Sequence, residues 1–151
     1  PRRNPIPFPQ HPRRPHHEAP RRRRHRKLCV FVKSMALFRT EEMQAKYKAF
    51  RDKGGLGSGC ALCEAPALHT FVHWKVIENR FPYDRVAQIH HMIVPKQHVT
   101  EEEVTSEAWA ELRELKNLPV LNDAYDFIIE AVPKNKSIPE HFHFHLVVAK
   151  D

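Results

Sequence analysis

The alternation of histidine with apolar residues near the end of the chain constrains the fold more than any other feature. Residues 141–145 read His-Phe-His-Phe-His, and the apolar run 146–148 follows. Alternation with period two predicts a half-buried strand, with His141, His143 and His145 on one face and the apolar residues on the other. Such a row is costly for structure alone, because every ring nitrogen needs a partner. Neutral imidazole is also a nucleophile and a metal ligand, so we expect a chemical site here.

The rest of the pattern predicts two helices and further strands. A helix starts after Thr40 as N-cap and ends at Gly54 and Gly55, and a second starts at Thr100 or Ser106 and ends before Pro119. Strands are expected over 69–78, 89–94, 125–132 and the histidine segment. Short connections favour an α+β fold in which helices pack on one side of an antiparallel sheet of about five strands. No glycine loop of the phosphate-binding type is present, since all four glycines lie between residues 54 and 59.

Positive charge is concentrated in residues 1–27. The segment holds ten Arg and Lys residues against one acid, so its net charge is +9, whereas the whole chain is +7 and residues 28–151 are −2. It also contains seven of the thirteen prolines. A segment this polar cannot offset its ordering entropy by burial, so we predict disorder. It is a solvated leader, a transit peptide or an attachment to nucleic acid; we favour the first, because basic tails are common and unspecific.

Other compositional features narrow the class of protein. No apolar run approaches the length of a membrane span, and the apolar stretch after residue 27 is interrupted by Lys33 and Arg39. We therefore expect no membrane partner and no secretory signal. The three cysteines are an odd number, which argues against a disulfide framework and suits a reducing compartment, so a cytoplasmic location is expected.

Residues 60–148 resemble the histidine triad superfamily, whose members are nucleotidyl hydrolases and transferases acting at an α-phosphate. The segment 141–147 fits the pattern His-φ-His-φ-His-φ-φ, where φ is apolar, and 90–98 resembles the preceding strand, His-φ₄-Pro-Lys-x-His. Residues 78–83 resemble the segment where family members place an asparagine near the nucleotide, here Asn79. The resemblance implies a catalytic domain over 60–151, and residues 1–59 lie outside it. Composition and pattern divide those residues into the basic tail, 1–27, and a helix with a glycine-rich joint, 28–59.

The resemblance implies covalent catalysis by the middle histidine. His143 would attack the α-phosphorus and form a nucleotidyl-histidine intermediate, which water or another acceptor releases. His145 and His90 would order its environment, and Asn79, Ser137 and His141 would contact the nucleotide. The loop before the triad departs from the family pattern, because it has no glycine and Ser137 stands four residues before His141. The remaining histidines, at 69, 73 and 91, are read as ordinary surface or hydrogen-bonded residues.

Cys60 and Cys63 have the spacing at which two thiolates reach one zinc ion. A redox pair is the alternative, but it calls for a βαβ context that the pattern does not predict. In some superfamily members, including the galactose-1-phosphate uridylyltransferases, two histidines complete the zinc site. Those positions are His98 and His141 here, so the resemblance implies a structural zinc held by four protein ligands.

The sequence thus predicts a zinc-containing nucleotidyl hydrolase or transferase whose partners are a nucleotide or nucleotide conjugate and a second copy of the chain. One alternative is an enzyme similar to aprataxin, which removes adenylate from DNA ends, with the basic tail on nucleic acid. Another is a non-catalytic, zinc-stabilised module that binds nucleotides. The base, the leaving group and the acceptor are not encoded in any pattern that we recognise.

Overall fold

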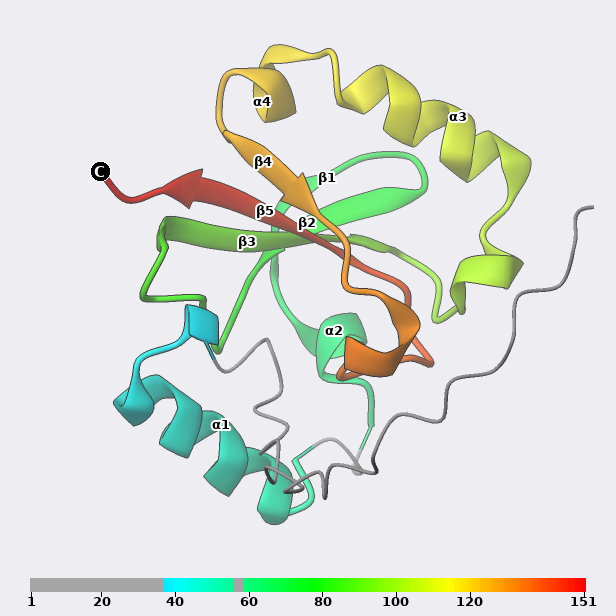
Figure 1. Ribbon diagram of the computed structural model, residues 1–151. Helices are drawn as coiled ribbons and strands as arrows, with labels where there is room; N and C mark the ends of the chain where they lie inside the picture. Colours follow the sequence, from blue (N-terminus) through cyan, green and yellow to red (C-terminus); the bar gives the residue numbers. More distant parts are fainter. Residues whose placement is uncertain (1–36, 56–58) are drawn as a thin grey trace, which may run out of the picture. The chain divides into compact units, whose positions relative to one another are not determined.

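The computed structural model describes residues 37–55 and 59–151 (Figure 1). The basic tail, 1–27, and its predicted disorder lie outside these residues. Five antiparallel strands form one sheet in the order β1-β2-β3-β5-β4, which confirms the predicted α+β class. The strands are β1 (Ala67–Thr70), β2 (Trp74–Glu78), β3 (Ala87–Pro95), β4 (Phe127–Ile129) and β5 (Phe144–Ala149). The helices are α1 (Glu41–Asp52), α2 (Ala61–Glu64), α3 (Ser106–Leu115) and α4 (Pro119–Asn122), with the 3₁₀ turns η2 (Glu101–Glu103) and η3 (Pro133–Asn135).

The strand predicted over 69–78 is in fact two strands joined by a turn at 71–73. The Phe71 amide donates to the Trp74 carbonyl oxygen at 2.8 Å. The amides of Val72 and His73 donate to the Glu111 carboxylate of α3 at 2.8 and 2.7 Å. Because this acid satisfies the turn from a distant helix, the local alternation could not reveal the break. Val72 is 71% exposed, although an unbroken strand over 69–78 would place it on the same face as the buried Trp74 and Val76.

The strand predicted over 125–132 is shorter than expected. β4 covers three residues and, among the residues that the structure describes, pairs with β5 alone, so its ladder hydrogen bonds there lie on one side. Phe127 is 56% exposed in this strand, although its sequence segment is apolar. Before β4, the Asp126 amide donates to the Val147 carbonyl oxygen of β5, and the Asp126 carboxylate accepts from the Ala149 amide. After β4, the Val132 carbonyl oxygen accepts from the Asn135 amide of the 3₁₀ turn η3, so the chain leaves the sheet there.

Helices lie on both sides of the sheet, not on one side as predicted (Figure 1). α3 buries Ala108, Leu112 and Leu115 against one face, on which Trp74 and Phe144 lie. On the opposite face Leu62 of α2 packs with a smaller cluster, Ile77, Met92 and Val94. Since neighbouring strand residues point to opposite faces, His145 lies on the α2 face, paired with Met92.

The start of α1 is fixed to the loop between β2 and β3. Thr40 caps the helix, its hydroxyl accepting a hydrogen bond from the Met43 amide at 3.2 Å. The Thr40 amide and hydroxyl donate to the two carboxylate oxygens of Asp84 at 2.8 and 2.6 Å. Hydrogen bonds to Thr40 lower the pKa of Asp84 against the opposing effect of burial, so the carboxylate is charged at neutral pH. α1 therefore sits beside the loop that leads into β3.

None of the helices in the described ranges is long and apolar enough to span a membrane.

Candidate active site and metal centre

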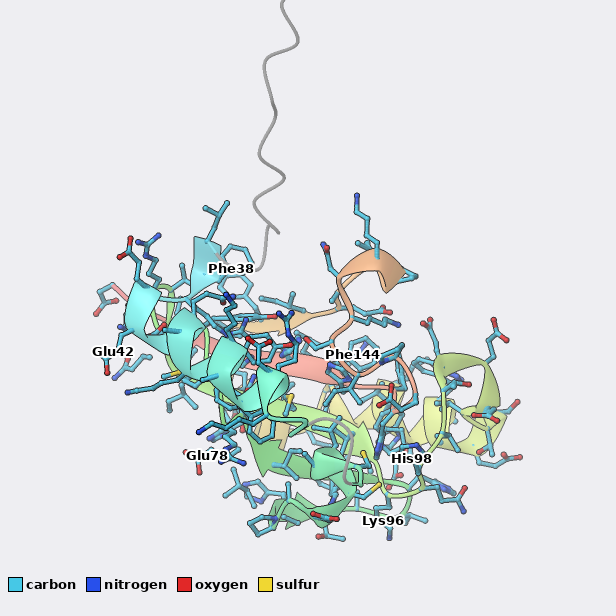
Figure 2. The ribbon with its side chains drawn as sticks, turned by 90° about the horizontal axis from the view of Figure 1, so that it is seen from below. Phe38, Glu42, Glu78, Lys96, His98 and Phe144 are labelled. Carbon is cyan, nitrogen blue, oxygen red and sulfur yellow. The ribbon has the colours of Figure 1, made fainter. Side chains whose placement is uncertain are left out.

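Two cysteines and two histidines, all predicted zinc ligands, come together from three segments. Cys60 and Cys63 flank the start of α2, His98 follows β3 and His141 precedes β5. One ligand atom from each residue lies within 4.8 Å of every other. Figure 2 shows His98 in the loop just after Lys96, at the end of the sheet near α2. His141 is fully buried, whereas Cys63 and His98 are exposed.

The donor geometry fits zinc. The ring of His141 donates from Nε2 to the Pro95 carbonyl oxygen at 3.0 Å, which leaves Nδ1 without a proton and free to ligate. This Nδ1 lies 3.1 Å from the Cys60 sulfur and 3.4 Å from the Cys63 sulfur, and the His98 Nδ1 lies 3.5 Å from the Cys63 sulfur. In a tetrahedral zinc site the ligand atoms are roughly 3.3–3.8 Å apart, so the four residues need little movement.

His143 presents one free ring nitrogen to a cavity. Its Nδ1 lies 2.9 Å from the His141 carbonyl oxygen, and because a carbonyl can only accept, Nδ1 carries the proton. Nε2 therefore keeps its lone pair. Burial lowers the pKa of His143, so the ring is neutral at pH 7. A neutral, correctly protonated imidazole is what a nucleophile requires.

A chain of hydrogen bonds runs behind His143. The Tyr83 amide donates to His90 Nδ1 at 2.8 Å, which leaves the His90 proton on Nε2. That Nε2 donates to His145 Nδ1 at 2.9 Å, and His145 Nε2 lies 3.3 Å from the Tyr83 hydroxyl. The backbone amide therefore fixes the tautomers of both histidines. The His145 ring in turn lies edge-on to the His143 ring, 5.3 Å between centres.

Burial keeps these groups uncharged. It lowers the pKa of His90 to about 3, with the Arg39 charge as the second cause, and it lowers the pKa of His145 well below its ordinary value. Burial also raises the pKa of Tyr83 to about 12. The hydrogen-bond chain therefore holds neutral histidines and a protonated phenol across the physiological range.

The pKa of His90 predicts acid-sensitive stability. Its folded pKa, about 3, is below the unfolded value, so the unfolded chain binds more protons between about pH 3 and 6.5 and stability falls as pH falls in this window. His90 should make the free energy of unfolding about 2 kcal/mol lower at pH 5 than at pH 7. Urea denaturation at both pH values should show this loss reduced by that amount in His90→Gln. The same substitution at His69, which is exposed, is the control. Equal pH dependence in wild type and His90→Gln would contradict the assignment.

A cavity of about 660 Å³ opens in front of His143. This volume suits a small organic ligand. Its floor is the sheet face that carries Ile77, Met92 and His145, and its walls come from α1, α2, the loop after β2 and the loop before the triad. Aromatic and apolar side chains dominate the α1 wall. Tyr47 packs edge-on against Phe81 and Phe50 packs at a tilt against it, with ring centres 5.4 and 5.0 Å apart. Such a wall is suited to a flat, apolar ring in the ligand.

The structure separates the predicted site residues into three groups. His143, His145, Asn79 and Ser137 line the cavity. His90 lies behind it and contacts two residues of the cavity wall, Asn79 and His145. The Asn79 side-chain nitrogen is 3.1 Å from His90 Nε2 and 3.5 Å from its Nδ1. His141 belongs to the metal cluster and is not among the residues that line the cavity, and its carbonyl oxygen accepts the hydrogen bond from His143. Asn79 itself is fixed by its carbonyl oxygen, which accepts from the Phe81 amide at 2.9 Å.

Most other residues of the cavity wall and the relay were not predicted as site residues, among them Arg39, Tyr47, Phe50 and Tyr83. The sequence carries a signal for Tyr47 and Phe50, because their helical spacing places both on one side of the expected helix. What they face could not be read from the sequence. Arg39 stood out only as an interruption of an apolar stretch.

Comparison with known proteins adds little to this picture. No family model matches the chain, and neither does any curated protein. Among solved structures, one described as "Hit Like Protein" matches with 17% sequence identity and a TM-score of 0.43, over 67% of this chain and 95% of that chain. The function proposed below is therefore inferred from the side chains of the site.

Proposed function

We propose that the chain is a nucleotidyl hydrolase or transferase of the histidine triad type. The observation that carries the proposal is the ring of His143, whose Nδ1–H donates a hydrogen bond to the His141 carbonyl oxygen, so that Nε2 keeps its lone pair beside a cavity of nucleotide size. The sequence pattern of the triad supports the same conclusion independently.

In the proposed reaction His143 Nε2 attacks the α-phosphorus of a nucleotide derivative. A bond forms between Nε2 and phosphorus, and the bond from phosphorus to the leaving group breaks. The leaving group keeps the electron pair and takes a proton from solvent. Water or another acceptor then attacks the same phosphorus and loses its proton to solvent. The bond between phosphorus and Nε2 breaks, and its electron pair returns to Nε2. His143 must be uncharged at the start of each turnover to act as a nucleophile, and burial favours this state by lowering its pKa.

The neighbouring residues support this step without taking part in bond making. His145 packs against the nucleophile and is itself held by His90, so both act as positioning residues. Asn79 lines the cavity and is proposed to contact the ribose or phosphate of the substrate. Ser137 is the polar side chain of the loop before the triad and is proposed to contact phosphate oxygens.

A structural zinc ion would complete the site. Cys60, Cys63, His98 and His141 would hold it, and four protein ligands leave no position for substrate. The ion would supply a cross-link between α2, the loop after β3 and the segment before β5. His141 matters twice, because its ring faces the metal position and its carbonyl holds His143.

Substrate profiling tests the proposed function. Purified protein would be incubated with dinucleoside polyphosphates, nucleotide sugars, nucleoside phosphoramidates and adenylated DNA, and products would be separated by chromatography. Release of a nucleoside monophosphate, or its transfer to an acceptor, from at least one class is expected. Binding without turnover of every class would instead favour the non-catalytic module. Turnover of adenylated DNA alone would favour the aprataxin-like alternative. Homodimer formation remains a further proposal, tested by light scattering.

Removing the basic tail should leave activity on small nucleotides unchanged. Residues 1–27 contribute almost no apolar side chains to a core, so a chain starting at Leu28 should fold as before. Turnover of a mononucleotide derivative and melting temperature would be compared with those of the full chain. Loss of mononucleotide turnover in the shortened chain would show that the tail belongs to the site.

A further inference from the structure

Arg39 is a buried cation that the proposed reaction does not use. It immediately precedes the N-cap of α1 and is 7% exposed. Its Nε donates to the Phe81 carbonyl oxygen at 3.1 Å. Its Cζ lies 4.7 Å from the centre of the Tyr47 ring and 5.1 Å from that of Tyr83, so the guanidinium contacts both rings. Carbonyl and aromatic contacts hold the side chain in place but do not neutralise its charge.

A buried charge normally has a partner of opposite sign, because an unpaired one is costly to desolvate. Within residues 37–55 and 59–151, no carboxylate forms an ion pair with Arg39. Asp84, whose charge reaches Arg39, uses both carboxylate oxygens for Thr40. Desolvation is the largest influence on Arg39 and lowers its pKa, but an arginine remains charged. The fold therefore keeps a positive charge here without supplying its counterion.

The unused donors of Arg39 are open to solvent. A guanidinium has five N–H donors, and Nε accounts for one. In the part of the chain that the structure describes, Nη1 and Nη2 form no hydrogen bond. A buried nitrogen without a partner would be an unsatisfied polar atom, and in the described residues Gln44 Oε1 is the one such side-chain atom. Nη1 and Nη2 of Arg39 are therefore accessible to solvent. Because Arg39 lines the same cavity as His143, these donors are available to a ligand of that cavity.

Other charges along the cavity do not cancel this one. Arg80, Glu64 and Glu78 also line it, but all three are exposed, so water and salt screen them. Figure 2 shows Glu78 at the outer side of the sheet below α1, pointing away from the ribbon. Arg39 is the buried member of the four, and a charge in a low-dielectric wall acts more strongly on a bound anion.

Arg39 stands apart from the nucleophile. Two rings connect it to His143: Arg39 contacts Tyr83, Tyr83 contacts His145, and His145 contacts His143. The ring centres of Tyr83 and His145 are 5.1 Å apart, and those of His145 and His143 are 5.3 Å apart. The reacting phosphorus must lie about 3–3.5 Å from His143 Nε2. A phosphate held by Arg39 is therefore a different group from the one under attack.

We propose that Arg39 binds a second phosphate of the substrate, so that the enzyme prefers nucleotides with a phosphate beyond the one that His143 attacks. The inference rests on the proposed function. A guanidinium fork binds phosphate oxygens through paired, charge-assisted hydrogen bonds, which matches the open Nη atoms. The second phosphate is either a β-phosphate or a phosphate on the ribose. Both present the same chemistry to Arg39.

Equilibrium binding of non-reacting probes tests the inference. Titration calorimetry would compare the 5′-monophosphate, the α,β-methylene diphosphate and the 3′,5′-bisphosphate of adenosine and of uridine. The wild type should bind at least one two-phosphate probe about 10-fold or more tightly than the monophosphate. The methylene diphosphate reports a β-phosphate site and the bisphosphate a ribose-phosphate site. If neither probe gains affinity over the monophosphate, the inference is overturned without any variant.

The variants Arg39→Gln and Arg39→Lys test whether Arg39 is the source of the higher affinity for two-phosphate probes. Arg39→Gln should lose the gain and retain the monophosphate affinity, and Arg39→Lys should retain part of the gain. Arg80→Gln, at the exposed arginine of the same cavity, is the matched control and should keep it. An unchanged ratio of affinities in a folded Arg39→Gln protein would overturn the inference. Equal weakening of monophosphate and two-phosphate probes would also overturn it, since that is the effect of a structural residue or of contact with the attacked phosphate.

These measurements do not depend on turnover. If His143 forms no nucleotidyl intermediate but Arg39 still gives the affinity gain, the proposed function fails and the phosphate site stands as a binding site. If the intermediate forms and the gain is absent or independent of Arg39, the inference fails and the proposed function survives.

Discussion

Replacing His143 with alanine is expected to lower turnover by about 10⁴-fold or more and to abolish covalent labelling by nucleotide. The ring supplies the only bond to phosphorus in the proposed first step, and loss of a covalent nucleophile has effects of this size. The hydrogen bond that it gives to the His141 carbonyl is local, so the fold should survive. Steady-state kinetics on the best substrate from profiling, together with a melting curve, measure both effects.

Two further variants set the scale for this result. His69→Ala changes an exposed histidine of β1 and should leave turnover unchanged. His145→Ala removes a positioning residue and should be milder than His143→Ala, because the nucleophile keeps its bond to His141. Near-normal turnover in a folded His143→Ala protein would contradict the covalent mechanism.

Loss of zinc is the second large effect that we expect. The purified protein should contain about one zinc per chain, and Cys60→Ser or Cys63→Ser should lose it. Each ligand comes from a segment that the unfolded chain scatters, so metal binding and folding are coupled. A cross-link of this kind should raise the melting temperature by about 10 °C or more. Turnover should fall as well, because the segment that carries His141 also positions His143.

Elemental analysis and calorimetry in the presence and absence of a strong chelator measure the zinc effect. Cys29→Ser provides the control, because Cys29 is the third cysteine and lies outside the predicted ligand set. It should leave zinc content and melting temperature unchanged. An active, stable preparation without bound metal would refute the structural role of zinc, while the mechanism at His143 would remain untouched.

Local sequence patterns predicted the site residues that lie on one strand or in one short motif. The alternation at 141–145 indicated the histidine row, and the spacing of Cys60 and Cys63 indicated a metal pair. β5 nevertheless begins only at Phe144. The residues before it leave the ladder because the Phe142 amide donates to the Val99 carbonyl oxygen, which turns His141 toward the cysteines. Alternation alone could not distinguish a ladder residue from one held by a loop.

The site residues that the sequence did not predict are held by contacts between segments far apart in the chain. Arg39 reaches Phe81, 42 residues away, and Tyr83 reaches His145, 62 residues away. No local pattern marks either residue as part of a site, because Arg39 is one of 25 basic residues and Tyr83 lies in the loop between β2 and β3. The break at residues 71–73 depends in the same way on Glu111 of a later helix. Tertiary partners of this kind are invisible to periodicity and to residue preference.

The most direct test of the central claim is to trap the intermediate and find its position. Protein would be mixed with the best substrate, quenched rapidly in base, digested and analysed by tandem mass spectrometry. The mechanism predicts an acid-labile nucleoside monophosphate on the peptide containing 141–145, attached to His143 and absent from His143→Ala. A label on another residue, or efficient turnover with no labelled state at any quench time, would contradict it.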